Sequence, residues 1–239
     1  MQIYYLKKPS LTKLLVGLVI VGIWLWAIFA AKSSTAMKEE PIYQGSEESK
    51  YVSFAINVDW GEEYLPEMVN IFKEHEVKST FFLTGRWTDN NQELARQIAA
   101  SGHEIGNHAY SHASPNALSE AENREEIKKT ADAIKEATGI TTNLYAPPSG
   151  ERKDHVLAAA TAEGYWTILW NVDTIDWQKP SVDTIIQRVV SKVKGGSIVL
   201  MHPTANTVAA LPAIISELQN QGYMLVPVSV NAGLEVAAD

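Results

Sequence analysis

Apolar and polar positions follow two alternating patterns along most of the chain. Short runs rich in β-branched and aromatic residues are typical of buried strands. Between them, apolar residues recur every three or four positions, as they do in helices. The pattern predicts strands over 51–58, 79–84, 103–107, 143–146, 165–172, 197–201 and 224–228. It predicts helices over 63–75, 91–100, 119–138, 155–163, 182–193 and 207–221.

Strands that alternate with helices form parallel sheets joined by crossover helices, which defines the α/β class. The number and length of the units fit a distorted, incomplete (β/α) barrel. In such barrels the chemistry gathers at the carboxyl ends of the strands. Polar candidates follow predicted strand ends repeatedly: Asp59, His108 with His112, the turn at Pro147, Asp173 with Asp176, and His202.

The amino terminus has a different pattern. Leu14 to Ala31 is a run of 18 uncharged, mostly apolar residues, close to the length that crosses a bilayer. Lys7, Lys8 and Lys13 precede it, so the positive-inside rule places residues 1–13 in the cytoplasm and the body of the protein outside. The alternative is a cleaved signal peptide with a small-residue site at 34–36, but its apolar core is usually shorter. We expect an uncleaved, single-pass membrane anchor.

The residues after the predicted anchor divide into three parts. Residues 32–50 are polar and contain Pro41 and Gly45, which predicts a flexible tether. Residues 51–232 hold all the predicted strands and helices and form the expected catalytic domain, and 233–239 is a tail.

Composition narrows the possible partners and chemistry. The chain has no cysteine, which excludes disulfide frameworks, thiolate metal sites and thiol catalysis. From residue 33 onward it carries 16 basic and 28 acidic side chains, a net charge of −12. Binding to nucleic acid requires a basic surface, so we expect no nucleic-acid partner.

The most informative motif is Asn107-His108-Ala109-Tyr110-Ser111-His112. Two imidazoles four residues apart share one side of a helical turn, so a short helix here would direct both at one metal ion. A pair of ordinary surface histidines is the alternative. The position of the motif after a predicted strand, with Asp59 and His202 at other strand ends, favours the metal site.

These residues resemble the polysaccharide deacetylase family, the NodB-homology group of carbohydrate esterases, over about residues 50–230. The metal motif of the family resembles 107–112, and the strand 81–85 (Phe-Phe-Leu-Thr-Gly) matches a recurrent family strand. The fourth motif resembles Asp173-Thr174-Ile175-Asp176-Trp177, and the fifth 198–202, which ends on His202. The resemblance implies a barrel of the NodB-homology type and membership of a membrane-anchored subgroup that includes sporulation-associated proteins.

The resemblance also implies metal-dependent removal of N-acetyl groups from an amino-sugar polymer, peptidoglycan or a chitin-like oligosaccharide. Two histidines and an aspartate of the family hold a divalent ion (zinc, cobalt or nickel) that activates water. His108 and His112 match the histidines. Family members usually carry two adjacent aspartates after the first strand, a base and then a ligand. Here Asn57 and Val58 occupy those positions, so Asp59 is the expected ligand; Asp59 as base, with two protein ligands, is the alternative.

Asn57 departs from the family pattern because an amide cannot take a proton from water as a carboxylate does. The third motif departs as well, since Ala146 stands where the family has an arginine that pairs with the base. Loss of both partners leaves no unpaired buried charge. Glu151 is the nearest carboxylate that could replace the base. A pseudoenzyme that binds cell-wall glycans is therefore the alternative to an active hydrolase.

The acid side of the site matches the family. The resemblance makes His202 the general acid that protonates the leaving amine, held by Asp176. Trp177 and Leu200 are expected to wall an apolar acetyl pocket, with Pro147, Pro148 and Ser149 beside them. The sequence as a whole predicts a metal-dependent deacetylase at the outer face of the cell membrane.

Overall fold

The computed structural model describes residues 40–234. The predicted anchor at 14–31, the first part of the predicted tether and most of the predicted tail lie outside these residues. Within the described part of the chain no helix is both long and apolar enough to cross a membrane.

The centre of the fold is a parallel sheet of eight strands in the order β5-β4-β3-β2-β1-β7-β6, with β8 paired to the start of β1. The strands are β1 (Tyr51–Val58), β2 (Thr80–Leu83), β3 (Glu104–Asn107), β4 (Leu144–Tyr145), β5 (Trp166–Thr167), β6 (Val172–Asp173), β7 (Ile198–Met201) and β8 (Met224–Leu225). β1 lies at the centre and is buried on both faces, as its continuous apolar sequence predicts.

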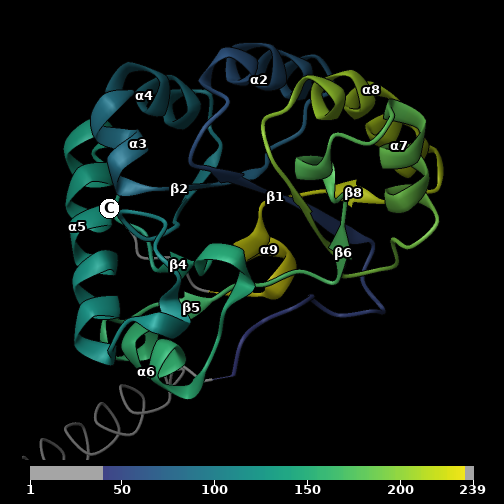
Figure 1. The fold of residues 1–239 in the computed structure, drawn as a ribbon. Helices are drawn as coiled ribbons and strands as arrows, with labels where there is room; N and C mark the ends of the chain where they lie inside the picture. The colour runs from purple at the N-terminus through teal and green to yellow at the C-terminus, as the bar shows by residue number, and fades with distance from the viewer. Residues whose placement is uncertain (1–39, 235–239) are drawn as a thin grey trace, which may run out of the picture. The chain divides into compact units, whose positions relative to one another are not determined.

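Helices surround the sheet on its outer side, except for the short C-terminal helix α9, which lies inside the ring (Figure 1). They are α2 (Leu65–Glu74), α3 (Gly85–Asn90), α4 (Gln92–Ala100), α5 (Glu120–Thr138), α6 (Asp154–Ala162), α7 (Val182–Val190), α8 (Ala205–Asn220) and α9 (Val228–Ala232). The predicted helices are confirmed, and most of their bounds agree within one to three residues. The six-residue helix α3 was not predicted, because its sequence Gly-Arg-Trp-Thr-Asp-Asn has no apolar period.

Helix α5 shows how the sequence sets its own bounds. The side chain of Ser119 accepts a hydrogen bond from the backbone of Glu122, and the side chain of Glu122 accepts one from the backbone of Ser119, a complete capping box. Gly139 ends the helix in the left-handed conformation (φ 78°). These contacts set both ends of α5, which packs against β3.

The predicted strand 165–172 is wrong as one element. It divides into β5 and β6, which pair with β4 and β7 at opposite ends of the sheet order. Only residues 168–171 connect them, and four extended residues span about 13 Å. The two edges therefore approach each other, and the sheet curls into the predicted incomplete barrel.

Residues 42–49, which we call the strap, connect the β5 edge of this curled sheet to the start of β7. Ile42 forms a bridge with Ile168 beside β5, and Gln44 forms one with Ser197 beside β7. A Cβ atom on Gly195 would lie 2.1 Å from the carbonyl oxygen of Ser49, so the close approach requires glycine. The predicted tether over 32–50 is thus wrong for its second half, because these residues satisfy their backbone hydrogen bonds on the domain.

The predicted last strand, 224–228, is also shorter than expected. It ends at Leu225, and Pro227 caps helix α9, which begins at Val228. The backbone N–H of Val228 donates to the hydroxyl of Thr80 in β2 (2.8 Å). The C-terminal segment therefore packs beneath the centre of the sheet, at the end opposite the predicted site.

Candidate functional site

A cleft of about 400 Å³ opens at the carboxyl ends of the strands. It brings together most of the predicted site residues, from segments up to 145 positions apart. Its lining consists of Asn57, Asp59, Trp60, His108, His112, Ser149, Trp170, Asp173, Trp177, Leu200 and His202.

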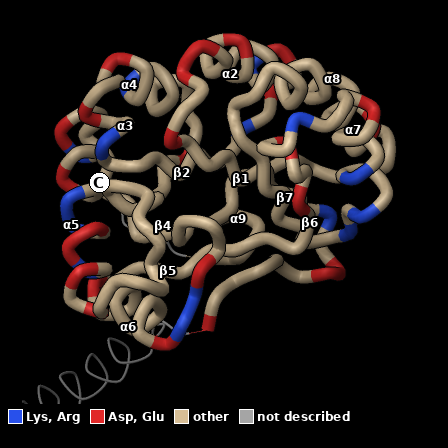
Figure 2. The backbone as a smooth tube through the Cα atoms, in the orientation of Figure 1, with Lys and Arg blue, Asp and Glu red and all other residues tan. Residues whose placement is uncertain are grey.

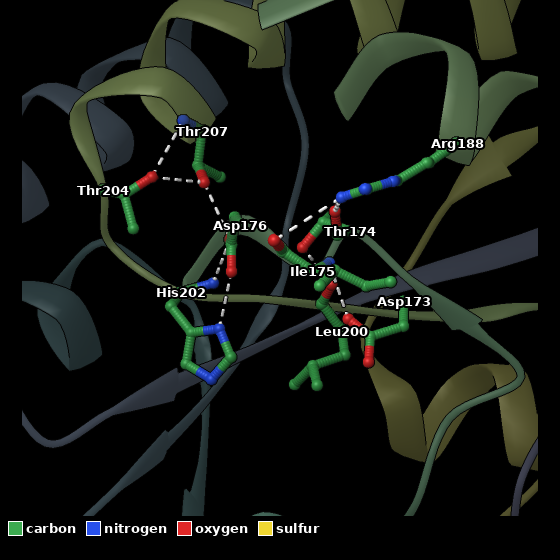
Figure 3. A network of polar contacts seen from close by, with 9 residues as sticks. All are labelled: Asp173, Thr174, Ile175, Asp176, Arg188, Leu200, His202, Thr204 and Thr207. Atoms are coloured by element: carbon green, nitrogen blue, oxygen red, sulfur yellow. Dashed lines mark hydrogen bonds and ion pairs between the residues drawn. The ribbon is translucent and has the colours of Figure 1, made fainter. Parts of the chain in front are cut away.

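On the β6–β7 side, His202 and the buried carboxylate of Asp176 form a hydrogen-bonded pair (Figure 3). The Nδ1 atom of His202 lies 2.7 Å from Oδ1 of Asp176, while Oδ2 accepts the backbone N–H of His202 and the hydroxyl of Thr207, each at 2.7 Å. The other ring nitrogen of His202 is left for the cleft. This arrangement orients an imidazole for proton transfer, as a general acid requires.

The charge of Asp176 is stabilised by these contacts. Burial alone raises the pKa of Asp176, but the hydrogen bonds and charge of His202, with the hydroxyl of Thr207, outweigh burial and leave the pKa lowered. Asp176 therefore remains an anion that can hold His202. Thr207 was not identified from the sequence, because a threonine in the first turn of α8 is also an ordinary helix residue.

The loop that carries Asp176 is held from two sides. Ile175 has φ 52°, a strained conformation for a β-branched residue, and its N–H donates to Oδ1 of Asp173 (2.7 Å). From α7, Arg188 donates to the carbonyl of Thr174 (2.7 Å), whose hydroxyl donates to the carbonyl of Leu200 (Figure 3). Asp173 both caps this loop and lines the cleft.

On the β3 side, the two histidines come together, but the predicted helical turn is wrong. Residues 108–114 form a loop in which Ala109 and His112 have positive φ angles of 61° and 57°. Glu126 of α5 holds this histidine loop, because its carboxylate accepts the N–H groups of Tyr110 and Ser111 and the hydroxyl of Ser111. Glu126 belongs to no motif, and in the sequence it resembles the exposed glutamates of α5.

His108 is buried, and its orientation is fixed by the third motif. Its Nδ1 atom donates to the carbonyl oxygen of Ala146 at 2.6 Å, which leaves Nε2 as a bare acceptor. Burial, and next the neighbouring His112, lower the pKa of His108 to about 3. The rings of His108 and His112 lie 5.1 Å apart between centroids. His108 is thus a neutral imidazole at neutral pH, the form that binds metals.

Asp59, the expected third ligand, has a different partner. Arg86 of α3 donates from Nε to Oδ1 (2.9 Å) and from Nη2 to Oδ2 (2.5 Å), and the hydroxyl of Thr84 donates to Oδ1 (2.9 Å). The Asp59 side chain is 12% exposed and that of Arg86 50% exposed. Arg86 was not identified from the sequence, because one arginine after a strand carries no motif.

This donor set does not fit a three-ligand metal site as it stands. Two imidazoles converge, but both oxygens of Asp59 are engaged by a permanent cation. Residues 40–234 contain no group of three or more His, Asp or Glu side chains arranged to hold a metal ion. The assignment of His108, His112 and Asp59 as a metal triad stays a prediction.

Asn57 lines the cleft, at the place where the family pattern predicts a base. Its side chain is 5% exposed, and its Oδ1 atom has no hydrogen-bond partner among the described residues. A buried acceptor without a partner is costly, so it is suited to a donor from a bound ligand.

The third motif departs from prediction in two ways. Ser149 lines the cleft, but Pro147 and Pro148 are buried and are not among the lining residues. Glu151 does not line the cleft, because its carboxylate accepts the hydroxyl of Ser114 (2.6 Å) and the N–H of Asn116 (2.8 Å). The hydroxyl of Ser114, then the N–H of Asn116, lower the pKa of Glu151. Glu151 therefore holds a loop and is not placed to replace the base.

Aromatic side chains form the walls of the cleft. Trp177 and Leu200 line it as predicted, and Trp170, which was not predicted, joins them. Trp60 is 43% exposed and stacks on His202 with 5.9 Å between ring centroids, so it shapes the rim. A second cleft of about 600 Å³ adjoins the first and shares Trp60 and Trp177 with it. Exposed tryptophans beside polar groups suit the mixed polar and apolar faces of a sugar.

The surface around these clefts carries both signs of charge. Acidic segments are distributed over the outer helices, and lysine and arginine lie among them as short separate segments (Figure 2). This distribution agrees with the net negative charge of the chain.

The curled parallel half-barrel with its clustered strand ends defines an α/β protein of the NodB type. The model of the polysaccharide deacetylase family matches residues 44–168, more than half of the chain, so the protein belongs to that family. The resemblance in its motifs is thereby confirmed at the level of the family.

Relatives within the family include both enzymes and a pseudoenzyme. A peptidoglycan-N-acetylglucosamine deacetylase of Bacillus cereus is 36% identical over 187 residues, which are 73% of this chain and 85% of the relative. The crystal structure of BA3943, a CE4 family pseudoenzyme from Bacillus anthracis, shares 43% identity with a TM-score of 0.80 and covers 82% of this chain and 70% of that one. A mutant of that pseudoenzyme has restored enzymatic activity.

A third relative is YlxY of Bacillus subtilis, 43% identical over 190 residues, which are 80% of this chain. The chain spans only 60% of the length of YlxY. Similarity to these proteins therefore establishes the family and the domain rather than the activity of a whole protein.

Proposed function

We propose that this protein binds an N-acetylated amino-sugar polymer of the peptidoglycan type in the cleft and hydrolyses it poorly or not at all. Membership of a family that includes peptidoglycan deacetylases supports the substrate class. The observation that carries the proposal is the state of the base side, where Asn57 replaces the carboxylate and Arg86 engages Asp59.

The chemistry of an amide explains why binding survives when hydrolysis does not. Deacetylation requires a base that takes a proton from the attacking water, and a neutral amide has no such capacity. The buried Oδ1 atom of Asn57 can instead accept a hydrogen bond, and the N–H of an acetamido group is a suitable donor. Leu200 and the tryptophans provide apolar contact for the methyl group and the sugar ring.

An active hydrolase that removes N-acetyl groups is the second candidate. Members of the family generally depend on a divalent metal, for which zinc, cobalt or nickel is our proposal. The His202–Asp176 pair favours this candidate, because it is built as a general acid that would protonate the departing amine. The residues His108, His112 and Asp59 would hold such a metal only after Asp59 had left Arg86.

We propose that the protein crosses the cell membrane once and that its domain lies at the outer face, because residues 14–31 are apolar and preceded by lysines. This position would keep the cleft beside cell-wall glycan. The test fuses a reporter that is active only outside the cytoplasm after residue 239. We expect an active fusion; an inactive one, beside an active cytoplasmic reporter at the same position, contradicts the proposal. A role in sporulation stays a prediction from the resemblance.

One experiment decides between the two functions. Purified protein is incubated with N-acetylglucosamine oligomers and with zinc, cobalt or nickel; acetate release and oligomer binding are measured separately. We expect binding without acetate release under all three metals. Turnover near 1 s⁻¹ or faster, within the usual enzymatic range, establishes the hydrolase instead. Absence of both binding and turnover rejects both candidates.

A further inference from the structure

Arg86 joins the two segments that carry the predicted metal ligands. Its side chain holds Asp59 at the end of β1, and its backbone N–H donates to the carbonyl of Tyr110 in the histidine loop (3.1 Å). The neighbouring N–H of Gly85 donates to the carbonyl of Ala109 (3.0 Å). One short helix end therefore fixes both the aspartate and the histidine loop.

The position of Arg86 is constrained by close packing. A Cβ atom on Gly85 would lie 2.3 Å from the ring of Tyr110, so the chain can pass this point only with glycine. Thr84 precedes α3 in an extended conformation, and its hydroxyl adds a third hydrogen bond to Asp59. The guanidinium thus emerges from a backbone that is held on both sides.

The contact differs from an ordinary surface ion pair. Exposed pairs with one contact contribute little and break readily. Here a planar guanidinium makes two parallel hydrogen bonds to a largely buried carboxylate, the geometry in which arginine binds most specifically. Both oxygens of Asp59 are thereby engaged by a cation that cannot lose its charge.

We propose that Arg86 takes the place of a divalent metal ion as the counter-charge of Asp59, and that this arginine determines that the cleft holds no tightly bound metal. A metal at His108 and His112 would have to displace the guanidinium from Asp59 and remain beside its positive charge. Arg86 then supplies, beside the paired histidines, the positive charge that a metal ion would otherwise supply. Glycan would bind in the cleft in the absence of metal.

This inference can be tested by metal binding alone, without glycan or turnover. The whole protein is freed of metal with a chelator, and Co²⁺ and Zn²⁺ binding is measured by calorimetry, with the visible absorption of Co²⁺ as a reporter of its ligands. Wild type is compared with Arg86→Gln and Arg86→Lys. Arg96→Gln is the matched control, because Arg96 pairs with Glu93 on the exposed face of α4.

We expect Arg86→Gln to bind one Co²⁺ per chain at least tenfold more tightly than wild type. Arg86→Lys and Arg96→Gln should stay near wild type, because the first keeps the positive charge and the second lies outside the cleft. Adding His108→Ala to Arg86→Gln should remove the gain, which assigns the ion to the histidine pair.

Two results overturn the inference. One is chelator-treated wild-type protein that binds one Co²⁺ per chain and retains it through dialysis, a result that needs no variant. The other is Arg86→Gln that keeps the wild-type circular dichroism and urea midpoint but gains no affinity. Failure of the glycan proposal would appear separately, as absent oligomer binding with these metal results unchanged.

Discussion

The two sides of the cleft differ in how completely they match a deacetylase. On the β6–β7 side, the buried carboxylate of Asp176 holds His202 and Thr207, and Arg188 holds the loop that carries Asp176 (Figure 3). On the β1–β3 side, the base is an amide, its expected arginine partner is Ala146, and Asp59 is bound to Arg86.

This difference indicates which parts of a site tolerate change. The acid side of the cleft also stabilises the fold. Asp176 is buried, and its loss would leave His202 and Thr207 without their hydrogen-bond acceptor. The base side lies on strand ends whose backbone pairing is independent of the side chains, so its residues can change without loss of the fold. A shared fold alone therefore does not establish a shared reaction.

The largest effect should come from rebuilding the base side. We expect Asn57→Asp with Ala146→Arg and Arg86→Gln, the last of which frees Asp59 for a metal ion, to raise acetate release from N-acetylglucosamine oligomers, with added zinc or cobalt, by about 10²–10⁴-fold, the usual contribution of a general base. The mutant of BA3943 with restored enzymatic activity supports the feasibility of such a change. Acetate release is measured by an enzyme-coupled assay.

The control for this rebuilding is the same three changes with His202→Ala, which should remove the gain because the acid is missing. Asn57→Asp with Ala146→Arg alone should gain much less, because Arg86 still engages Asp59. A full gain without Arg86→Gln would show that Arg86 does not control the metal.

The next effect concerns stability, and it compares one carboxylate from each side. Asp176→Ala removes the acceptor of three hydrogen bonds from a buried site and should lower the free energy of unfolding by about 3–5 kcal/mol. Asp59→Ala leaves a half-exposed Arg86 that water can solvate, so we expect a loss of about 1 kcal/mol. Urea unfolding at pH 7 measures both. Equal losses would contradict the assigned difference.

The two sides should also lose stability in different pH ranges. Burial, and next the charge of Lys78, lower the pKa of His103 at the start of β3 to about 4. Because the unfolded chain binds a proton at higher pH than the folded chain does, stability falls as the pH drops from about 6.5 to 4, by about 2–3 kcal/mol for this residue. The lowered pKa of Asp176 acts in the same direction but only below about pH 4.

Denaturant unfolding as a function of pH tests this separation. His103→Gln should flatten the curve between pH 6.5 and 4. Asp176→Asn should flatten the curve below pH 4 only. A single transition common to all variants would show that the two sides do not titrate independently.

The sequence predicted the fold better than the details of the site. Most of the strands and helices follow from their apolar periods, and α5 follows from its capping residues. The prediction of a single strand over 165–172 was wrong, because the apolar run continues through residues 168–171, which connect β5 to β6. The prediction of a flexible tether was wrong at the strap for a different reason. Residues there pair with the sheet through their backbone, which a polar composition does not reveal.

Within the site, the motifs identified several residues that line the cleft but few of the residues that hold them. His108, His112 and His202 were found because their spacing matches a family pattern. Glu126 and Arg86 were missed, because each acts on a loop that is distant in sequence and brought close by the sheet order. The positive φ angles that shape the histidine loop fall on non-glycine residues and leave no mark in the sequence.

The smallest effect should come from the two tryptophans at the rim, one from each side of the cleft. Trp177 is 56% exposed, so its removal changes few packing contacts, but a sugar ring stacked on it would lose about 1 kcal/mol of binding. We therefore expect Trp177→Ala to weaken oligomer binding by about three- to tenfold while unfolding stays within 0.5 kcal/mol of wild type, as is usual for surface changes. Met224→Ala, an exposed apolar residue on β8, is the control and should alter neither quantity.

Trp60 belongs to the altered side of the cleft, but its ring stacks on the acid His202 of the other side. Since Trp60 and Trp177 border both clefts, the loss of affinity in Trp60→Ala should increase with oligomer length if the chain of sugars continues into the second cleft. Calorimetry with oligomers of two to six units measures this dependence. An equal loss at every length would confine the glycan to the first cleft and would leave the second without a part in binding.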